Sequence, residues 1–219
     1  MTVGALVLVG ASWLFGGISE DVLHGDPLTV VDLTVADWFH AHATPLLTKG
    51  MLLISNLHGV VAISLYFSLL ALYLLWKHDW YWLWCLGLTV PGGMLLNESM
   101  KFAFQRARPS FDMPLLTLST FSFPSGHVAG TVLFYGVLGA MLVSKTQVWR
   151  RRVRIVFAGV ALVVLVALSR LYLGVHYLSD VLAAFAEAAV WLSLCMMGTH
   201  TFWQHRVENS RKGNTHDPT

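Results

Sequence analysis

Three short segments of this hydrophobic chain carry polar residues of the types that act on phosphate groups. The segments are Lys101–Pro109 (KFAFQRARP), Pro124–His127 (PSGH) and Ser169–Asp180 (SRLYLGVHYLSD). They hold cations, two histidines, a Ser-Gly turn and an aspartate, which together meet the needs of phosphoryl transfer through a covalent histidine intermediate. No residue set in them is obviously suited to a metal ion. The sequence therefore predicts a phosphate-handling site assembled from three separate parts of the chain.

The first segment places two cations at a predicted helix end. Lys101 and Arg108 are seven residues apart, about two helical turns, so they share one face if the helix continues that far. Pro109 then stops or bends the helix. The guanidinium would bind a phosphate in bidentate fashion and the ammonium as a point charge; alternatively, both cations only reach for lipid headgroups. Glu98 can pair with Lys101, and Arg106 is expected to point elsewhere.

The second segment has the features of a helix start that binds an anion. Pro124 suits a first helical turn, and Gly126 lets a ligand approach the backbone closely. Free N–H groups and the positive end of the helix dipole favour an anion there, and Ser125 adds a hydroxyl donor. His127 is placed to protonate a leaving oxygen. The alternative is an interfacial helix cap with an incidental histidine.

The third segment carries a histidine and an aspartate four residues apart. On one helical face, the Asp180 carboxylate can hold one imidazole nitrogen of His176 and leave the other free to attack phosphorus. Arg170 lies six residues before His176, about 120° away on an unbroken helix, so the chain must turn between them. Gly174 is the expected turning point. The alternative is a pair that merely satisfies itself, but ionisable residues at membrane depth usually indicate function.

The composition predicts an all-α, polytopic membrane protein. Of the 219 residues, 56% are hydrophobic and 12% charged, and the mean hydropathy is +0.63. Several apolar segments are close to the length of about 20 residues that spans a bilayer, so we expect six transmembrane helices in a bundle. These predicted spans are Val3–Ile18, Met51–Trp76, Tyr81–Met100, Val128–Val143, Ile155–Tyr172 and Ser179–Thr199. The first begins without a basic region and lacks a convincing small-residue cleavage site, so we interpret it as a retained helix rather than a signal peptide.

The distribution of lysine and arginine predicts the orientation in the membrane. Cations concentrate in the link between the fourth and fifth spans and in the tail: Lys145, Arg150, Arg151, Arg152, Arg154, Arg206, Arg211 and Lys212. Both regions are therefore expected in the cytoplasm, with both termini, and the three motif segments on the outer face of the plasma (inner) membrane. The net charge of +2 is too small to suggest a nucleic-acid partner.

One membrane-embedded domain, residues 1–207, is expected, followed by a polar cytoplasmic tail, 208–219, that we expect to be disordered. In the outer loop Ser19–Gly50, an interfacial amphipathic helix would contain Leu33, Val35, Trp38 and Phe39. Two cysteines lie in predicted spans and are expected to pack as small hydrophobic side chains rather than to form a disulfide. The oligomeric state is not encoded in a recognisable pattern.

Taken together, the three segments resemble the type 2 phosphatidic acid phosphatase family. Its pattern is Lys-x6-Arg-Pro, then Pro-Ser-Gly-His, then Ser-Arg-x5-His-x3-Asp, and this chain matches every position in order. The six-span layout extends the resemblance over nearly the whole chain. Vanadium-dependent haloperoxidases carry a similar pattern, but they are soluble, and the hydropathy here argues against them.

The resemblance implies a role for each matching residue. His176 would be the nucleophile that forms a phosphohistidine, Asp180 would orient it, and His127 would be the general acid for the leaving group and later help to activate water. The resemblance also implies which groups hold the phosphoryl oxygens: Lys101, Arg108, Ser125, the Gly126 backbone N–H and Arg170. The resemblance implies no metal and no cofactor.

The function expected from this resemblance is hydrolysis of a lipid phosphate or pyrophosphate at the outer membrane face. Undecaprenyl pyrophosphate, phosphatidylglycerophosphate and phosphatidic acid are the substrate types it suggests, and membrane lipids are the expected surroundings. A lipid phosphotransferase is one alternative. A binder of lipid phosphates without enzymatic activity is another, although binding alone needs only the cations and not the two histidines.

Overall fold

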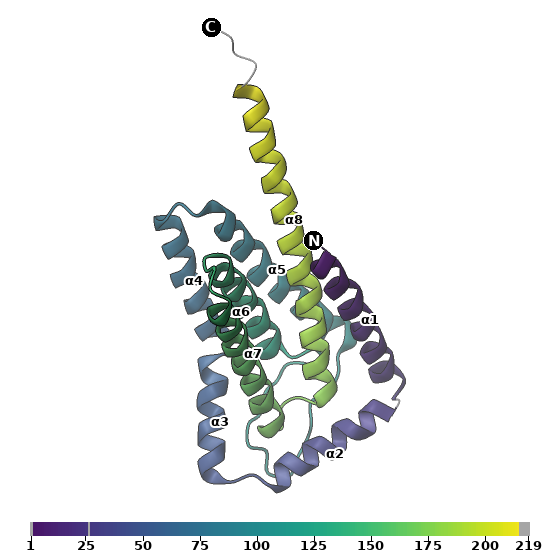
Figure 1. Ribbon diagram of the computed structural model, residues 1–219. Helices are drawn as coiled ribbons and strands as arrows, with labels where there is room; N and C mark the ends of the chain where they lie inside the picture. Colours follow the sequence, from purple (N-terminus) through teal and green to yellow (C-terminus); the bar gives the residue numbers. More distant parts are fainter. Residues whose placement is uncertain (1, 26, 215–219) are drawn as a thin grey trace.

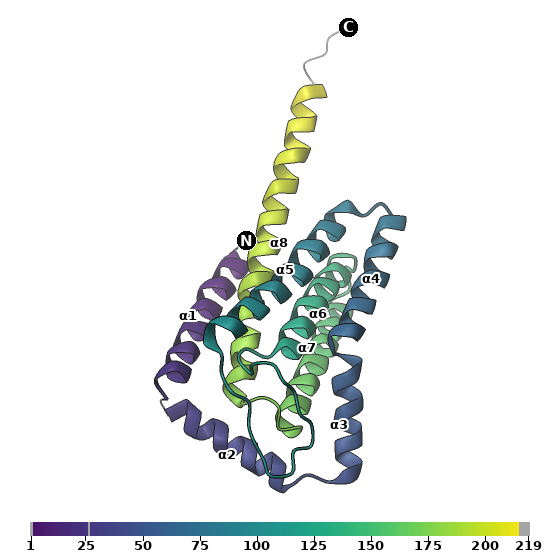
Figure 2. The same cartoon turned by 180° about the vertical axis from the view of Figure 1, so that it is seen from behind.

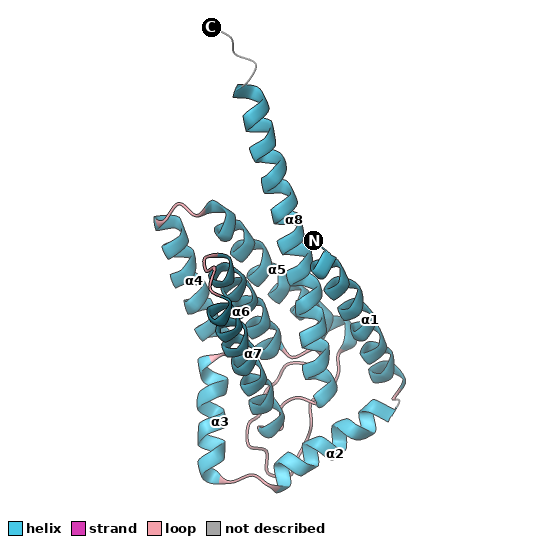
Figure 3. Ribbon diagram, in the orientation of Figure 1, coloured by secondary structure: helices cyan, strands magenta, loops and turns pink. Residues whose placement is uncertain are grey.

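The computed structural model describes residues 2–25 and 27–214, and within these ranges every regular element is an α-helix (Figure 3). This confirms the all-α expectation. The helices, in chain order, are α1 (Thr2–His24), α2 (Pro27–Ala41), α3 (Pro45–Leu57), α4 (Val60–Trp76), α5 (Trp80–Phe104), α6 (Gly126–Ser144), α7 (Trp149–Tyr172) and α8 (Leu178–Asn214).

The number of helices that can span a membrane differs from the six expected. Among the described residues, α1, α6, α7 and α8 are long and apolar enough, and α3 with α4 makes a fifth span if the pair is counted as one. The helix α5 covers the third predicted span, but its tryptophans, glycines and Asn97 make it less apolar. The chain is thus an integral membrane protein, and the lower hydropathy of α5 leaves four or five candidate spans among the described residues, which does not conflict with a six-span layout.

The second predicted span, Met51–Trp76, is in fact two helices that meet at an angle of 43°. The break lies at His58 and Gly59, whose backbone N–H groups donate to the carbonyl oxygens of Ser55 and Asn56. Gly59 has an extended backbone and begins α4 as its N-cap. The short segment Ser55–Gly59 (SNLHG) is polar, but it lies between longer apolar runs, so a hydropathy window of span length averages it into one continuous span.

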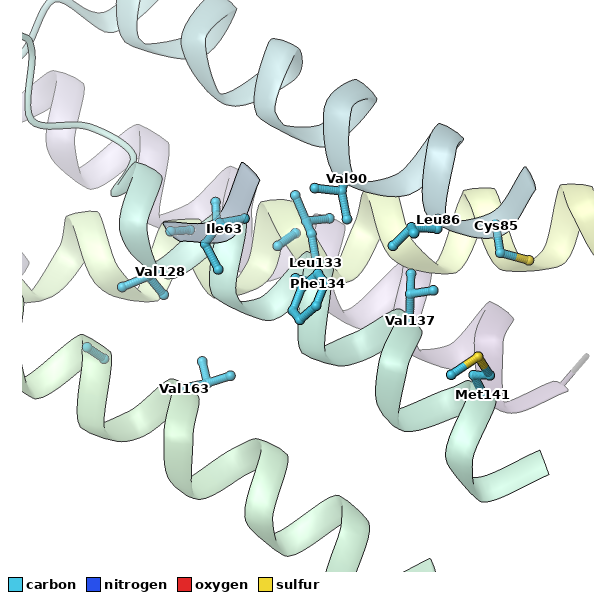
Figure 4. Close-up of a cluster of buried hydrophobic side chains, with 14 of the residues drawn as sticks. Ile63, Cys85, Leu86, Val90, Val128, Leu133, Phe134, Val137, Met141 and Val163 are labelled. Carbon is cyan, nitrogen blue, oxygen red and sulfur yellow. The ribbon is translucent and has the colours of Figure 1, made fainter. Parts of the chain in front are cut away.

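The core is built around α6, which contacts α4, α5, α7 and α8. Figure 4 shows its apolar side chains, among them Leu133 and Phe134, between α5 residues such as Leu86 and Val163 of α7. Glycines allow close approach between these helices: a Cβ at Gly93 would lie 2.5 Å from Leu133, and one at Gly136 would lie 2.5 Å from Leu192.

One end of the bundle is closed by α2, which crosses it and contacts α1, α7 and α8 (Figures 1 and 2). This helix contains the predicted interfacial segment, although it buries Asp32 and Ala36 rather than an apolar stripe. At the opposite end α8 extends past the other helices to Asn214 (Figure 1), and so includes the first part of the segment predicted as a polar tail. Residues 215–219 lie outside the described residues.

Candidate active site

The three motif segments meet at the end of the bundle that α2 closes. The parts of the chain that lie together there (Figure 2) are the C-terminus of α5, the loop 105–125, the start of α6, the turn 173–177 and the start of α8. Backbone and side-chain bonds join the segments directly. Lys101 Nζ donates to the Pro124 carbonyl oxygen at 2.7 Å, and the Ser125 backbone N–H donates to the Asp180 carbonyl oxygen at 3.1 Å.

Lys101 lies in the last turn of α5, where it is buried. Its ammonium also donates to Asn97 Oδ1 at 3.0 Å, and it lies 4.0 Å from Glu98, the predicted ion-pair partner. The helix ends at Phe104, because Gln105 takes a left-handed conformation with φ 46°. The helix therefore does not continue to Arg108, the condition for a shared helical face is not met, and the loop brings the second cation to the site.

Arg108 reaches the site from this loop. Its Nε donates to the Thr120 carbonyl oxygen at 2.7 Å and its Nη2 to the Phe121 carbonyl oxygen at 2.9 Å, which anchors the side chain. Nη1 donates to the Val175 carbonyl oxygen at 2.6 Å and lies 3.1 Å from His176 Nε2. The arginine thus links the first segment to the third.

The Pro-Ser-Gly-His segment forms the start of α6, with Ser125 as the N-cap and Gly126 as the first helical residue. The sequence predicted Pro124 in the first turn of the helix, but Pro124 precedes the helix. A Cβ at Gly126 would lie 3.3 Å from Lys101 Nζ, so a residue without a side chain allows the ammonium to approach the helix start. His127 follows in the first turn of α6, where the backbone N–H groups have no acceptor within the helix.

His127 lines a mainly apolar cavity of about 290 Å³ between α4, α5 and α6. Gly126 and His58 lie at the same cavity as His127, and the rest of the lining is mostly apolar, including Phe67 and Met94. The side chain of His127 is thus only partly buried, between the polar site and this cavity. A histidine in that position can exchange a proton with a group that enters beside the cations.

His176 and Asp180 are neighbours, but not on one helical face as expected, because α8 begins only at Leu178. His176 lies in the turn after Gly174, whose φ of +66° confirms the expected turning point. The Nδ1 atom of His176 lies 3.4 Å from Asp180 Oδ2. The same carboxylate oxygen accepts the Tyr177 backbone N–H at 2.9 Å, which fixes the turn against the start of α8.

The contacts of His176 define which nitrogen can act. An arginine only donates hydrogen bonds, so the contact with Arg108 requires an unprotonated Nε2. Nδ1 then carries the proton and faces Asp180. Burial lowers the pKa of His176 well below its usual value, and the charges of Arg170 and Arg108 lower it further. The imidazole is therefore neutral, with its free lone pair directed at the cations.

Arg170, near the end of α7, is almost entirely buried. Its Nη1 donates to Ser55 Oγ of α3. Its Nε and Nη2 atoms have no hydrogen-bond partner among the described residues, and the same is true of the buried hydroxyl of Ser125. Buried donors normally find acceptors, so these groups fit a site that receives an anion.

Several residues of this site were not found by sequence reasoning. Asn97, buried one turn before Lys101, donates from Nδ2 to Glu187 Oε2 at 2.9 Å. The expectation that Arg106 points elsewhere is wrong, since it forms an ion pair with Asp180 at 2.6 Å. Because that expectation assumed a helix through residue 106, the left-handed Gln105 accounts for the error. No sequence signal links Arg106 to its second carboxylate partner, Asp32.

Among residues 2–25 and 27–214, no cluster of three or more His, Cys, Asp or Glu side chains could hold a metal ion. The groups around His176 are mainly donors: the two arginines, the ammonium of Lys101 and the N-terminus of α6. Such a set can neutralise the oxygens of a phosphate and hold it against a histidine nucleophile.

A membrane-embedded helical bundle with this site places the chain in a known class. Residues 82–204 match the model of the PAP2 superfamily, and the chain belongs to that family. The matched range includes all three motif segments.

The chain is also similar to individual proteins of known name or structure. The chain is 43% identical over 94 residues to phosphatidylglycerophosphatase B of Bacillus subtilis (strain 168), a match that covers 42% of this chain and 45% of the relative. The match therefore spans about half the length of that curated relative. The crystal structure of a transmembrane PAP2 type phosphatidylglycerolphosphate phosphatase from Bacillus subtilis is 26% identical, with a TM-score of 0.78, and the match covers 90% of this chain and 96% of that one. Aquifex aeolicus LpxE, 20% identical, shares the fold with a TM-score of 0.62 over 76% of this chain and 95% of its own.

Proposed function

We propose that this chain is a lipid phosphatase that hydrolyses the phosphate from a membrane lipid through a phosphohistidine on His176. The observation that carries the proposal is the position of His176 Nε2, 3.1 Å from Arg108 Nη1, with Asp180 behind the opposite ring nitrogen. An unprotonated nitrogen directed at guanidinium groups suits attack on a phosphorus atom whose oxygens those groups hold.

The reaction has two half-reactions. In the first, Nε2 attacks phosphorus, the bond from phosphorus to the lipid oxygen breaks, and His127 gives its proton to that oxygen. Arg108, Arg170 and the ammonium of Lys101 hold the three remaining oxygens. In the second, His127 takes a proton from a water molecule whose oxygen attacks phosphorus. The N–P bond then breaks and inorganic phosphate leaves.

The substrate is a lipid phosphate, with phosphatidylglycerophosphate as the first candidate. The Bacillus subtilis matches support this choice, because one is named phosphatidylglycerophosphatase B and the other a phosphatidylglycerolphosphate phosphatase. Phosphatidic acid and undecaprenyl pyrophosphate present the same terminal phosphate to the cations, so they belong in the same test. The partly apolar surroundings of His127 suit the lipid side of the bond that breaks.

The site opens on the outer face of the membrane. Support comes from the arginine-rich start of α7, because α6 begins and α7 ends at the site, so their connection lies at the opposite end of the bundle. Cations favour the cytoplasmic side. The described end of α8 lies away from the site as well (Figure 1). Both termini are accordingly cytoplasmic.

Phosphate release by the purified protein in detergent tests the reaction. Each of the three lipids is supplied without an acceptor and with EDTA, and inorganic phosphate is measured. Hydrolysis without an acceptor is expected, with the highest kcat/KM for phosphatidylglycerophosphate, and H176A should bind lipid phosphate without turnover. Undiminished turnover by H176A would contradict the mechanism. Strict dependence on an acceptor lipid would favour a phosphotransferase, and strong loss with EDTA would indicate a metal.

Cysteine labelling tests the orientation. Asp112 is exposed in the loop 105–125, and Gln147 is exposed in the connection between α6 and α7. A membrane-impermeant thiol reagent added to intact cells should label D112C but not Q147C, and should label Q147C after permeabilisation. The reverse pattern would overturn the proposed orientation.

A further inference from the structure

Arg106 lies behind the His176–Asp180 pair, on the side away from the cations that face the phosphate site. Its Nη1 donates to Asp180 Oδ1 at 2.6 Å and to Ser179 Oγ at 2.6 Å. Its Nη2 donates to Asp32 Oδ2 at 2.8 Å. The arginine side chain is 15% exposed, while the two carboxylates beside it are almost completely buried. This guanidinium therefore bridges two buried carboxylates and is not free to bind substrate.

The two oxygens of Asp180 have separate partners. Oδ2 accepts the Tyr177 backbone N–H at 2.9 Å and lies 3.4 Å from His176 Nδ1. Oδ1 contacts Arg106. With the arginine in place, the carboxylate plane is held so that Oδ2 faces the imidazole. Without it, Oδ1 would be a buried acceptor with no charged partner, which is costly for an ionised carboxylate.

Asp32 fixes the other side of the arginine from α2. Its Oδ1 accepts the Ser179 backbone N–H at 2.8 Å, so it caps the start of α8, and its Oδ2 accepts the Ser179 hydroxyl at 2.5 Å. The Tyr177 ring covers the guanidinium at 4.4 Å. Burial acts to lower the pKa of Arg106, but Asp180 and Asp32 outweigh it and raise that pKa, so the cation is well matched to this pocket.

This arrangement bears on the phosphohistidine step. When Nε2 bonds to phosphorus, the imidazole ring gains positive charge while Nδ1 keeps its proton. An ionised Asp180 beside Nδ1 stabilises that charge. The carboxylate must therefore stay ionised in a buried position, and the nearest positive charge that can ensure this is Arg106.

We propose that Arg106, held in place by Asp32 of α2, is a positioning residue that keeps Asp180 ionised and aimed at His176 Nδ1. It acts through Asp180, whereas Arg108 and Arg170 act on the phosphoryl oxygens. The inference rests on the proposed phosphohistidine mechanism. It also gives α2 a function, because this helix supplies the carboxylate that fixes the arginine.

The kinetic test compares R106A, R106K and D32N with the wild-type protein. We expect kcat to fall about 10- to 100-fold in R106A, the range for residues that orient a reacting group, with KM changed less than about threefold. R106K should recover part of kcat, because an ammonium restores the charge but cannot contact both carboxylates in the same geometry. Millimolar guanidinium should restore part of the activity of R106A but none of that of H176A, since the side chain removed in R106A is 15% exposed.

Three results would overturn the proposal. Unchanged kcat in R106A with a lower Tm would make the arginine purely structural. A rise in KM without a change in kcat would place it on the substrate. If R106A fails to fold, R106K and D32N test the positioning role instead. A wild-type kcat in both variants would contradict that role.

A spectroscopic measurement separates this inference from the proposed function. In protein labelled with ¹⁵N-histidine, the His176 signals, identified by their loss in H176N, should show a protonated Nδ1 and an unprotonated Nε2. R106Q should show a mixture of tautomers, because Asp180 no longer holds Nδ1–H. Identical ring signals in R106Q and wild type would contradict the positioning role. Absence of phosphate release from every lipid would instead contradict the proposed function, and the nitrogen signals would still decide the role of Arg106.

Discussion

Arg108 Nη1 lies 3.1 Å from His176 Nε2, so the proposed phosphate-binding cation and the proposed nucleophile are in direct contact. The arginine occupies the lone pair that would attack phosphorus. A phosphate oxygen that accepts the same N–H would release that lone pair at the moment the substrate is held. In the proposed mechanism, binding of the phosphate and activation of the nucleophile would thereby be coupled in one hydrogen-bond exchange.

This coupling predicts that Arg108 is more than a counter-ion. R108K keeps the charge but loses the fixed fork that joins the loop, Val175 and His176, so kcat/KM should fall by about 100-fold or more, as on loss of one oxyanion donor. Phosphate release measures this. R151A, at an exposed arginine of the opposite end of α7, is the control and should match wild type. Wild-type kcat/KM in R108K would show that charge alone suffices.

A second prediction concerns the support of Lys101. Asn97 Oδ1 accepts a hydrogen bond from Lys101 Nζ at 3.0 Å, and Asn97 Nδ2 donates one to Glu187 Oε2 at 2.9 Å. Asn97 thus holds the ammonium in a defined position. N97A should leave the ammonium with less support and lower kcat/KM by about tenfold, mainly through a higher KM. S99A, at an exposed position of the same helix, is the matched control. Equal kinetics in N97A and S99A would contradict the prediction.

The convergence of the three segments could be predicted because each carries ionisable residues in an otherwise apolar chain. Gly174 could be predicted as a turn because Arg170 and His176 could not share a face on a straight helix. These inferences depend on residue type and spacing, which the sequence contains.

The contacts of Arg106 could not be predicted, because they depend on where α5 ends. Gln105 adopts a left-handed conformation that no strong residue preference announces, and it turns Arg106 toward Asp180. Its other partner, Asp32, is separated from it by 74 positions in sequence. The bend between α3 and α4 was missed for a different reason, since the short polar segment Ser55–Gly59 is averaged with the longer apolar runs on both sides of it.

The turn at Gly174 gives a stability prediction with an internal control. G174A would place a Cβ in a left-handed backbone with φ +66° and 2.8 Å from the Phe111 ring. The conformation alone should lower the free energy of unfolding by about 1–2 kcal/mol, and the ring contact adds to that. In G139A, in the interior of α6, the new Cβ would meet nothing within 4 Å, so stability should stay equal or rise by up to about 1 kcal/mol.

Thermal unfolding in detergent and phosphate release measure both variants. G174A should lose activity as well as stability, because the same turn carries His176. A Tm for G174A at or above that of G139A would contradict the described turn.

The low pKa of His176 predicts how stability depends on pH. Burial, reinforced by Arg170 and Arg108, lowers the pKa in the folded protein, whereas an unfolded histidine titrates near pH 6.5. Below pH 6.5 the unfolded state therefore binds more protons than the folded state, so protonation favours unfolding. The contribution of the neutral imidazole is fully present above that pH. It is lost as the pH falls, at up to about 1.4 kcal/mol per pH unit.

H176N lacks this proton and isolates the effect. The Tm of wild type minus that of H176N should be constant from pH 8 to 7 and fall progressively from about pH 6.5 to 5. Differential scanning fluorimetry of the two proteins in the same detergent measures it. A difference that stays constant down to pH 5 would mean that His176 titrates alike in both states, and a difference that rises in acid would mean that the folded protein favours the imidazolium. Either result would contradict the lowered pKa of His176 in the folded protein.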